Sequence, residues 1–147
     1  MHTLRAQGLP VPVPVAARYS RAGFFYRADL ITEALPAARP LSDAITGAVL
    51  QDEVWRKVGT AVAKFHRAGV HHADLNAHNI LLGESAKVFI LDFDRGRIRA
   101  RGAWEAAVLS RLKRSLNKIK SQRANVGFGE REWTALMEGY VKAVTSE

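Results

Sequence analysis

The feature that most constrains this chain is a pair of short apolar runs, NILL at 79–82 and KVFILDF at 87–93, joined by the turn GESA. Two apolar runs of this length around a short turn predict a β-hairpin. Asn79 opens the first strand and Asp92 closes the second, so a hairpin places both residues at its open end. The loop that contains Asp74 lies at the same end. We therefore expect one amide and two carboxylates to converge beside a buried hairpin.

The residues ahead of this hairpin predict a second region of β structure. HTLRAQGL at 2–9 is typical of the last turns of a helix that ends at a glycine. The prolines that follow force an extended path. PVAARY at 14–19 and FFYRADLITEAL at 24–35 then predict two strands joined by the turn SRAG. We expect core and hairpin packing, rather than stacking on a ligand, from the aromatic run Phe24, Phe25 and Tyr26.

Apolar residues at helical spacing predict that most of the remaining chain is α-helical. A short helix is expected in LSDAITGAVL at 41–50, capped by Ser42. Longer helices are expected over residues 52–68, 102–123 and 130–144. Their apolar faces include Val54, Val58, Ala61, Val62 and Phe65 in the first, and Val108, Leu109, Leu112, Leu116 and Ile119 in the second. The fold class is therefore α+β and mostly helical.

The charge balance narrows the choice of partners. The 22 basic and 14 acidic residues give a net charge of +8 in 147 residues, which suits a single domain with an anionic partner. The absence of cysteine excludes disulfides, thiolate metal sites and cysteine nucleophiles. The first residues lack the pattern of a signal peptide, and no apolar run approaches the roughly 20 residues of a spanning helix. Any membrane contact is therefore expected to be peripheral.

The converging polar side chains match the needs of phosphoryl transfer from a nucleotide. One carboxylate orients or deprotonates the attacking hydroxyl, and a second holds the Mg²⁺ that bridges the phosphates. An amide oxygen can complete the metal site, because Mg²⁺ prefers hard oxygen ligands and few protein contacts. Asp74, Asn79 and Asp92 supply this set. A single Asp at a strand end is usually a turn or cap residue, so the interpretation depends on all three residues together.

The spacing H-x-D-x-x-x-x-N from His72 to Asn79, followed by two strands that end in D-F-x, resembles the protein-kinase-like fold. Ala73, Asn76 and Asp94 stand where regulated protein kinases usually carry Arg, Lys and Gly, which points to the small-molecule branch of the fold. HADLNAHNILL and ILDFDRGRIR resemble the lipopolysaccharide kinase family, which includes the 3-deoxy-D-manno-octulosonic acid (Kdo) kinases. GLPVPVPVAARY and FFYRADLITE extend the likeness over nearly the whole chain.

The resemblance implies a role for each site residue. Asp74 would be the catalytic base or the residue that orients the hydroxyl. Asp92 and Asn79 would bind Mg²⁺ and thereby ATP, and main-chain groups around Glu33 and Leu35 would hold the adenine. The implied reaction is ATP-dependent phosphorylation of a Kdo hydroxyl on a lipid A precursor. It would take place at the cytoplasmic face of the bacterial inner membrane, with the enzyme bound peripherally.

The resemblance also implies lobes. Residues 1–35 would form the end of the small lobe and the hinge, and residues 36–147 a protein-kinase-like large lobe with a short catalytic hairpin. His72 would brace the catalytic loop, whereas Asn76 and His78 would shape that loop or the sugar site. The glycine-rich loop and phosphate-binding Lys of a complete kinase are missing ahead of the first strands. We therefore expect a C-terminal portion of a kinase that does not catalyse alone.

Two groups of basic side chains are open to other interpretations. A zinc site at His71 and His72 is disfavoured, because adjacent histidines in a strand or tight loop point apart. Arg111, Arg114 and Lys118 lie opposite the apolar face of their predicted helix, as expected of a solvated face. The alternative is a cationic surface for a phosphorylated glycolipid and anionic membrane headgroups. That surface would also include Arg95, Arg97, Arg99 and Arg101.

Other functions fit the sequence less well. Another small-molecule kinase, such as an aminoglycoside phosphotransferase, would need an acidic pocket for cationic drugs, and the basic excess argues against it. A nucleic-acid-binding domain would use the charge of +8, but it would leave Asp74, Asn79 and Asp92 unexplained, so no nucleic-acid partner is expected. A non-catalytic module that binds an anionic ligand is a further alternative.

Overall fold

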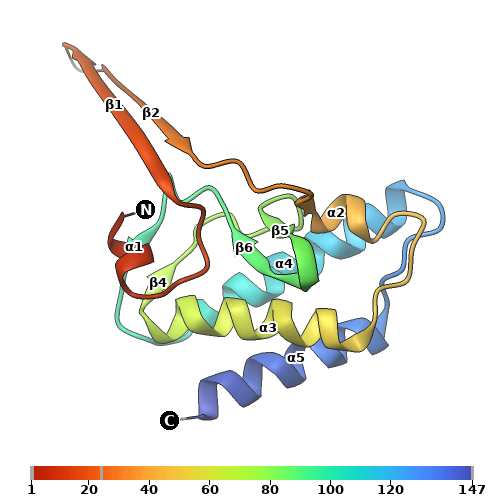
Figure 1. Cartoon of the computed structure of the whole chain (residues 1–147). Helices are drawn as coiled ribbons and strands as arrows, with labels where there is room; N and C mark the ends of the chain where they lie inside the picture. The colour runs from red at the N-terminus through yellow and green to blue at the C-terminus, as the bar shows by residue number, and fades with distance from the viewer. Residues whose placement is uncertain (1, 24, 147) are drawn as a thin grey trace.

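The computed structural model describes residues 2–23 and 25–146. A long β-hairpin, β1–β2, projects from a body built mainly of helices (Figure 1). The elements in chain order are α1 (His2–Ala6), β1 (Pro14–Ala22), β2 (Phe25–Thr32), β3 (Arg39–Pro40), α2 (Leu41–Ala44), α3 (Asp52–Arg67), β4 (Val70–His71), β5 (Ile80–Leu82), the 3₁₀ turn η1 (Glu84–Ala86), β6 (Val88–Ile90), β7 (Arg97–Ile98), α4 (Trp104–Gln122) and α5 (Glu130–Thr145). The predicted α+β class is confirmed. The division into lobes at residues 35 and 36 stays a prediction.

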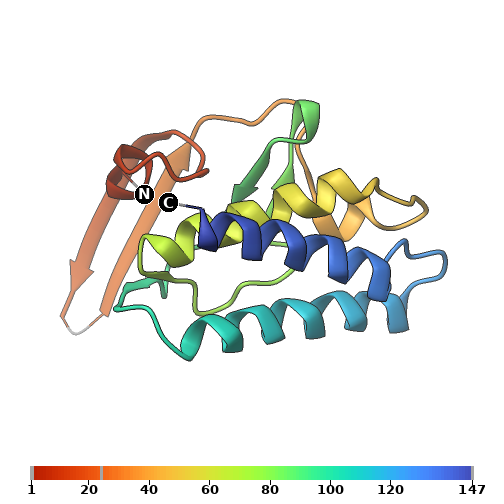
Figure 2. The same ribbon diagram turned by 90° about the horizontal axis from the view of Figure 1, so that it is seen from below.

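The helical body is centred on α3, whose apolar stripe is the one expected from its spacing. Val58, Ala61, Val62 and Phe65 are buried, whereas Val54 is only partly buried. Helix α5 lies along α3 and runs in the same direction, and α4 runs alongside them in the opposite direction (Figure 2). Apolar faces of three helices thus meet around one core, which is the main source of burial in this fold.

Two glycines allow α3 and α5 to approach closely. A Cβ atom on Gly59 would collide with the backbone of Leu136 and Tyr140 in α5. A Cβ atom on Gly139 would collide with the backbone of Arg56 in α3. Glycine weakens a helix interior by about 1 kcal/mol relative to alanine. Here that cost is offset by packing of the two helix backbones that no larger residue permits.

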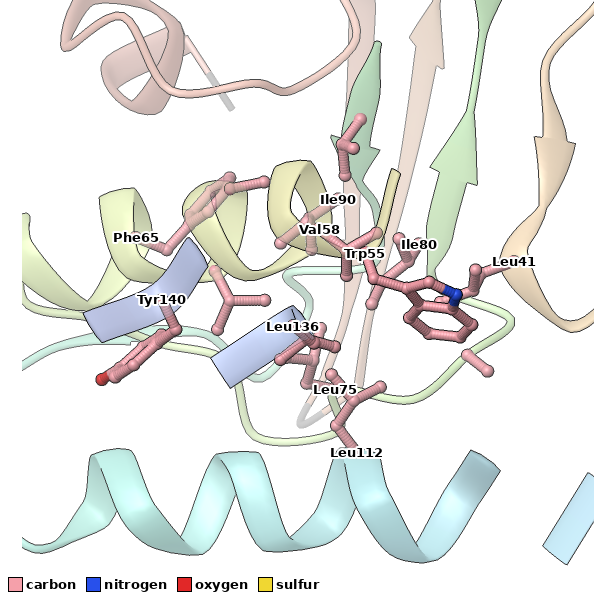
Figure 3. Packing of buried hydrophobic residues seen from close by; sticks show 14 of the residues in the cluster. Leu41, Trp55, Val58, Phe65, Leu75, Ile80, Ile90, Leu112, Leu136 and Tyr140 are labelled. Atoms are coloured by element: carbon pink, nitrogen blue, oxygen red, sulfur yellow. The ribbon is translucent and has the colours of Figure 1, made fainter. Parts of the chain in front are cut away.

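The β5–β6 hairpin forms as predicted and lies on α3. Its antiparallel register pairs Ile80 with Ile90 and Leu82 with Val88, and these four side chains are buried. Figure 3 shows Ile80 and Ile90 within the same cluster as α3, and Leu75 next to Leu112 of α4. The hairpin and the loop before it are therefore anchored from both sides.

The predicted cap at Ser42 is wrong. The helix begins at Leu41, and Pro40 at its N-cap position makes no side-chain capping bond. Ser42 is fully buried in the first turn, and its N–H donates to the Ala77 carbonyl at 3.1 Å. Pro40 presets the entry backbone, and the tertiary bond to Ala77 draws Ser42 inward. The helix is also shorter than expected, since it ends at Ala44.

The aromatic run at the start of β2 does not pack in the core as predicted. Phe25 is 82% exposed, because β1 and β2 pair only with each other and project away from the body. The expectation for Phe24, and for the side chain of Tyr26, lies outside the described residues.

Among the residues that the structure describes, no helix is long and apolar enough to cross a membrane.

Candidate active site

The β5–β6 hairpin brings the predicted polar residues to one place. The Leu91 N–H donates to the Asn79 carbonyl at 2.9 Å, so Asp92 directly follows the last paired position. The Asn79 side-chain amide donates to the main-chain carbonyl of Asp74 at 3.1 Å. Asp74, Asn79 and Asp92 therefore meet at the open end of the hairpin, as the spacing predicts.

The 72–79 loop is held by its own side chains. Asn76 donates from its amide nitrogen to the Asp74 carbonyl at 3.0 Å. Its amide oxygen accepts the N–H groups of His78, at 2.9 Å, and Asn79, at 3.2 Å. An Asn that closes such local bonds fixes a turn. Asn76, given only a weak role from the sequence, is thus the residue that shapes this loop.

His72 ties the 72–79 loop to the strand that precedes Asp92. Its Nδ1 accepts the Asp74 N–H at 3.2 Å, so Nε2 carries the proton and donates to the Leu91 carbonyl at 2.7 Å. Burial lowers the pKa of His72, although the Leu91 bond and the nearby Asp92 and Asp74 carboxylates oppose this shift. A neutral, buried imidazole with both nitrogens engaged suits the bracing role expected for it.

The side chain of Asp92 is exposed and makes no hydrogen bond or ion pair with the described residues. Its backbone has a φ of 62°, in the left-handed region that few residues other than glycine adopt. Such strain is concentrated at functional sites. The nitrogen of the Asn79 amide is engaged with Asp74, which leaves the amide oxygen to face away from that bond. One free carboxylate and one amide oxygen fit the donor chemistry of Mg²⁺.

Asp74 has a cationic neighbour that the sequence did not assign to it. Arg111 Nη1 of α4 lies 3.7 Å from Asp74 Oδ1, and the two side chains are 49% and 65% exposed. The sequence placed Arg111 on the basic face of a helix, either as a solvated residue or as part of a cationic surface for an anionic lipid. The helical spacing of Arg111, Arg114 and Lys118 could show from the sequence that these residues share one face of the helix. It could not show that this face lies opposite Asp74.

The predicted hinge segment offers free main-chain groups. The Glu33 N–H donates to the Val13 carbonyl at 2.8 Å, and the Leu35 carbonyl accepts the Ala38 N–H at 3.2 Å. The Glu33 carbonyl and the Leu35 N–H form no backbone hydrogen bond within the described part of the chain. One acceptor and one donor are therefore available two residues apart.

Comparisons with known proteins point to one family. A model of the family described as "Lipopolysaccharide kinase (Kdo/WaaP) family" matches residues 1–140. The chain is similar to a 3-deoxy-D-manno-octulosonic acid kinase of Photobacterium profundum, with 44% identity over 140 residues that cover 95% of this chain and 59% of the relative. A kinase of the same name from Vibrio vulnificus is 40% identical over 137 residues, or 93% of this chain and 58% of the relative.

A third relative of this name, from Stenotrophomonas maltophilia, is 45% identical over 125 residues, which cover 84% of this chain and 50% of the relative. The chain therefore spans between half and three fifths of the length of these relatives. The family model, by contrast, matches nearly the whole chain. The chain belongs to the lipopolysaccharide kinase (Kdo/WaaP) family.

Proposed function

We propose that this chain is part of a kinase that transfers a phosphoryl group from ATP to a hydroxyl of Kdo on a lipid A precursor, in the synthesis of the lipopolysaccharide core. The observation that carries the proposal is the meeting of Asp74, Asn79 and Asp92 at one end of the β5–β6 hairpin. Membership of the family and the names of the relatives support the same reaction. In this proposal, residues 1–35 are the end of the small lobe with the hinge, and residues 36–147 are the large lobe.

Asp74 is the catalytic residue of this proposal. Its exposed carboxylate accepts the proton of the attacking sugar hydroxyl or holds that hydroxyl in line with the phosphate. The loop around it is fixed by Asn76 and His72, so the carboxylate is presented without a large loss of conformational entropy. Arg111 Nη1, 3.7 Å from Asp74 Oδ1, places a positive charge beside this carboxylate.

Asn79 and Asp92 are the proposed ligands of Mg²⁺, which neutralises charge on the phosphates of bound ATP. Among the described residues, no three His, Asp or Glu side chains gather closely enough to form a metal site. In this proposal the protein contributes one carboxylate and one amide oxygen. The Glu33 carbonyl and the Leu35 N–H are the proposed partners of the adenine.

A peripheral position on an anionic membrane surface belongs to the same proposal. The basic surface around β7 supports it, because Arg95, Arg97 and Arg99 line a hollow of about 500 Å³ next to the 72–79 loop. Basic side chains attract anionic headgroups by about 1 kcal/mol each when close to the membrane. The proposed location is the cytoplasmic face of the bacterial inner membrane, where ATP and the lipid precursor meet.

The test is phosphoryl transfer from labelled ATP to Kdo–lipid A. It uses the chain alone and the completed chain, by which we mean this chain joined to the part of the Photobacterium profundum relative that the match does not cover. We expect transfer by the completed chain and none by the chain alone. Asp74→Asn should reduce kcat by about 100-fold to 10,000-fold and leave ATP binding intact.

Asp43→Asn is the matched control, because Asp43 is an exposed carboxylate that pairs with Arg123 and whose side chain makes no hydrogen bond or ion pair with the 72–79 loop. It should leave kcat unchanged. Full activity of Asp74→Asn would disprove the role of Asp74. A completed chain that binds ATP but phosphorylates no Kdo-bearing lipid would disprove the proposed reaction. Transfer by the chain alone, at the rate of the completed chain, would disprove the expectation that it is an incomplete catalyst.

A further inference from the structure

A hollow of about 460 Å³ lies between the 72–79 loop and α4. Its lining includes Asp74, Asn76 and His78 from the loop, and Arg111, Arg114 and Lys118 from the helix. The volume is within the usual range of about 300–1,000 Å³ for small-molecule sites. A larger cavity of about 810 Å³, lined by residues of α3, α5 and the segment from η1 to β6, has no residue of the 72–79 loop in its lining. Asp74 itself lines the hollow beside α4, and it lines neither this larger cavity nor the hollow formed by Arg95, Arg97 and Arg99.

The cations of this α4 hollow differ from other cations of the same region. Lys113 is paired with Glu130 at 3.2 Å, and Arg123 is paired with Asp43 at 3.3 Å. Arg114 and Lys118 make no ion pair with the residues that the structure describes. Asp74 is the one carboxylate in the lining, against three cationic side chains. The hollow therefore carries unbalanced positive charge that an anionic ligand would neutralise.

The position of the hollow relative to Asp74 is fixed by contacts between the loop and the helix. The Ala77 N–H donates to Ser115 Oγ of α4 at 3.1 Å. Leu75 and Leu112 are both buried between these elements. Arg111 reaches Asp74 with one nitrogen, at 3.7 Å, and a guanidinium has further donors that remain for a second anion. An anion held in the hollow would consequently lie next to the proposed base.

We infer that the α4 hollow binds the carboxylate of the acceptor sugar and so selects an acidic sugar as substrate. This inference rests on the proposed function, in which the acceptor is the acid in the names of the relatives. Arg114 and Lys118 bind the carboxylate, and Arg111 contacts both the carboxylate and Asp74. Charge-assisted bonds to a carboxylate supply both affinity and orientation. Holding the acid group at this site presents a hydroxyl of the same ring system to Asp74.

Calorimetric titration of the 147-residue chain with free Kdo tests the site without ATP. The probes are Kdo, its uncharged methyl ester and inorganic phosphate. We expect Kdo to bind, the methyl ester to bind at least about tenfold more weakly, and phosphate to compete poorly. Arg114→Ala and Lys118→Ala should each weaken Kdo binding about tenfold. Lys113→Ala is the matched control, because Lys113 lies on the same helix and is paired with Glu130.

Three outcomes would overturn the inference: no binding of Kdo, equal binding of acid and ester, or equal loss in Lys113→Ala. Strong competition by phosphate would assign the hollow to a lipid phosphate instead and would also overturn it. Circular dichroism of each variant verifies that it is folded, and Lys118→Gln replaces any variant that is not.

Kinetics of the completed chain separate the inference from the proposed function. Arg114→Ala should raise the KM for Kdo–lipid A about tenfold and leave the KM for ATP unchanged, which a merely structural role would not do. Phosphoryl transfer by Arg114→Ala with an unchanged KM for the acceptor would refute carboxylate binding in the hollow and would leave the proposed reaction standing. If Kdo binding depends on Arg114 but the completed chain transfers no phosphoryl group, the proposed reaction is refuted and carboxylate binding in the hollow still stands.

Discussion

The helical body and the β1–β2 hairpin are built from similarly apolar segments, but the body buries its apolar side chains and the hairpin exposes them. In the body, the apolar stripes of α3, α4 and α5 meet one another and the β5–β6 hairpin. In β1–β2, the strands pair only with each other, and Val15, Phe25, Leu30 and Ile31 are all exposed. The difference teaches that the pattern of apolar residues predicts a helix or strand, whereas the stability of that helix or strand depends on whether a second layer of structure covers its apolar face. Isolated two-stranded hairpins are marginal in water.

The largest expected contrast is between two phenylalanines. Phe65 of α3 is 2% exposed and stacks on Phe93 with ring centroids 5.1 Å apart, whereas Phe25 is 82% exposed. Phe65→Ala should lower the free energy of unfolding by about 4 kcal/mol, because it leaves a cavity in the core. Phe25→Ala should change it by less than about 0.5 kcal/mol. Urea unfolding of the chain measures both. Equal losses would show that the hairpin is a full part of the cooperative core.

The second contrast uses glycines within the body. Gly59→Ala would force a methyl group onto the backbone of α5, which cannot move without separating the two helices. We expect a loss of about 3 kcal/mol or more, at the upper end of overpacking effects. Gly102→Ala is the matched control, because no atom lies within 4 Å of the added methyl group. Its unfolding midpoint in urea should match that of the wild type. A mild effect of Gly59→Ala would mean that α3 and α5 pack less tightly than described.

These two contrasts also mark how far the sequence could predict the structure. Helical spacing identified the buried face of α3 correctly, because periodicity depends on the chain itself. It could not show that Gly59 faces α5, since that contact depends on another segment. Phe25 was misjudged for the same reason: its hydrophobicity predicts burial, but no partner layer exists among the described residues. Ser42 was misjudged because a tertiary bond overrides its capping preference.

The candidate site was easier to predict than the layer contacts. Asp74, Asn79 and Asp92 are close in sequence and are joined by one short hairpin, so local pairing decides where they meet. Arg111 was not assigned to Asp74, because it lies on a distant helix whose docking onto the 72–79 loop is a tertiary event. The left-handed backbone of Asp92 was also hidden, since aspartate only occasionally adopts it.

A buried polar chain joins all three long helices and makes the body sensitive to pH. Tyr140 Oη of α5 donates to Glu105 Oε2 of α4 at 3.2 Å. His66 Nδ1 of α3 lies 2.9 Å from the same Tyr140 oxygen and donates to it, because the tyrosine proton is used for Glu105. Burial lowers the pKa of His66 to about 4, although Glu105 opposes this shift. Burial and Glu105 raise the pKa of Tyr140 to about 12.

The folded body should therefore lose stability as the solution becomes acidic. Because the folded pKa of His66 is lowered from 6.5 to about 4, the unfolded chain binds the proton more readily between these values. The stabilising contribution is complete above pH 6.5 and is lost as the pH falls toward 4. Its size is at most about 3 kcal/mol. Urea unfolding at about pH 7 and about pH 4 measures it.

His66→Gln keeps a hydrogen-bond donor toward Tyr140 but does not titrate. The difference in unfolding free energy between this variant and the wild type should change by about 3 kcal/mol between the two pH values. His72 titrates in both proteins, so its contribution cancels in the difference. The pKa of Glu105 is lowered chiefly by its bond to Arg101 but also by His66, so the difference measures the coupled pair His66 and Glu105. If the unfolding free energies of the variant and the wild type depended on pH in the same way, His66 would not be a cause of the acid sensitivity.

The smallest effect is expected from an ion pair in the β1–β2 hairpin. Arg18 and Asp29 face each other across the ladder, with Arg18 Nη2 at 3.0 Å from Asp29 Oδ2 and side chains that are 74% and 44% exposed. Exposed pairs of this kind contribute roughly 0–1 kcal/mol, because water screens the charges and the long side chains lose conformational freedom. Arg18→Ala should therefore shift the urea midpoint barely at all. It should, however, speed amide hydrogen exchange in β1 and β2 without changing exchange in α3, since local opening of the hairpin does not require the body to unfold. A parallel increase in α3 would show that the hairpin and the body open together, and the contrast between them would then be one of exposure and not of stability.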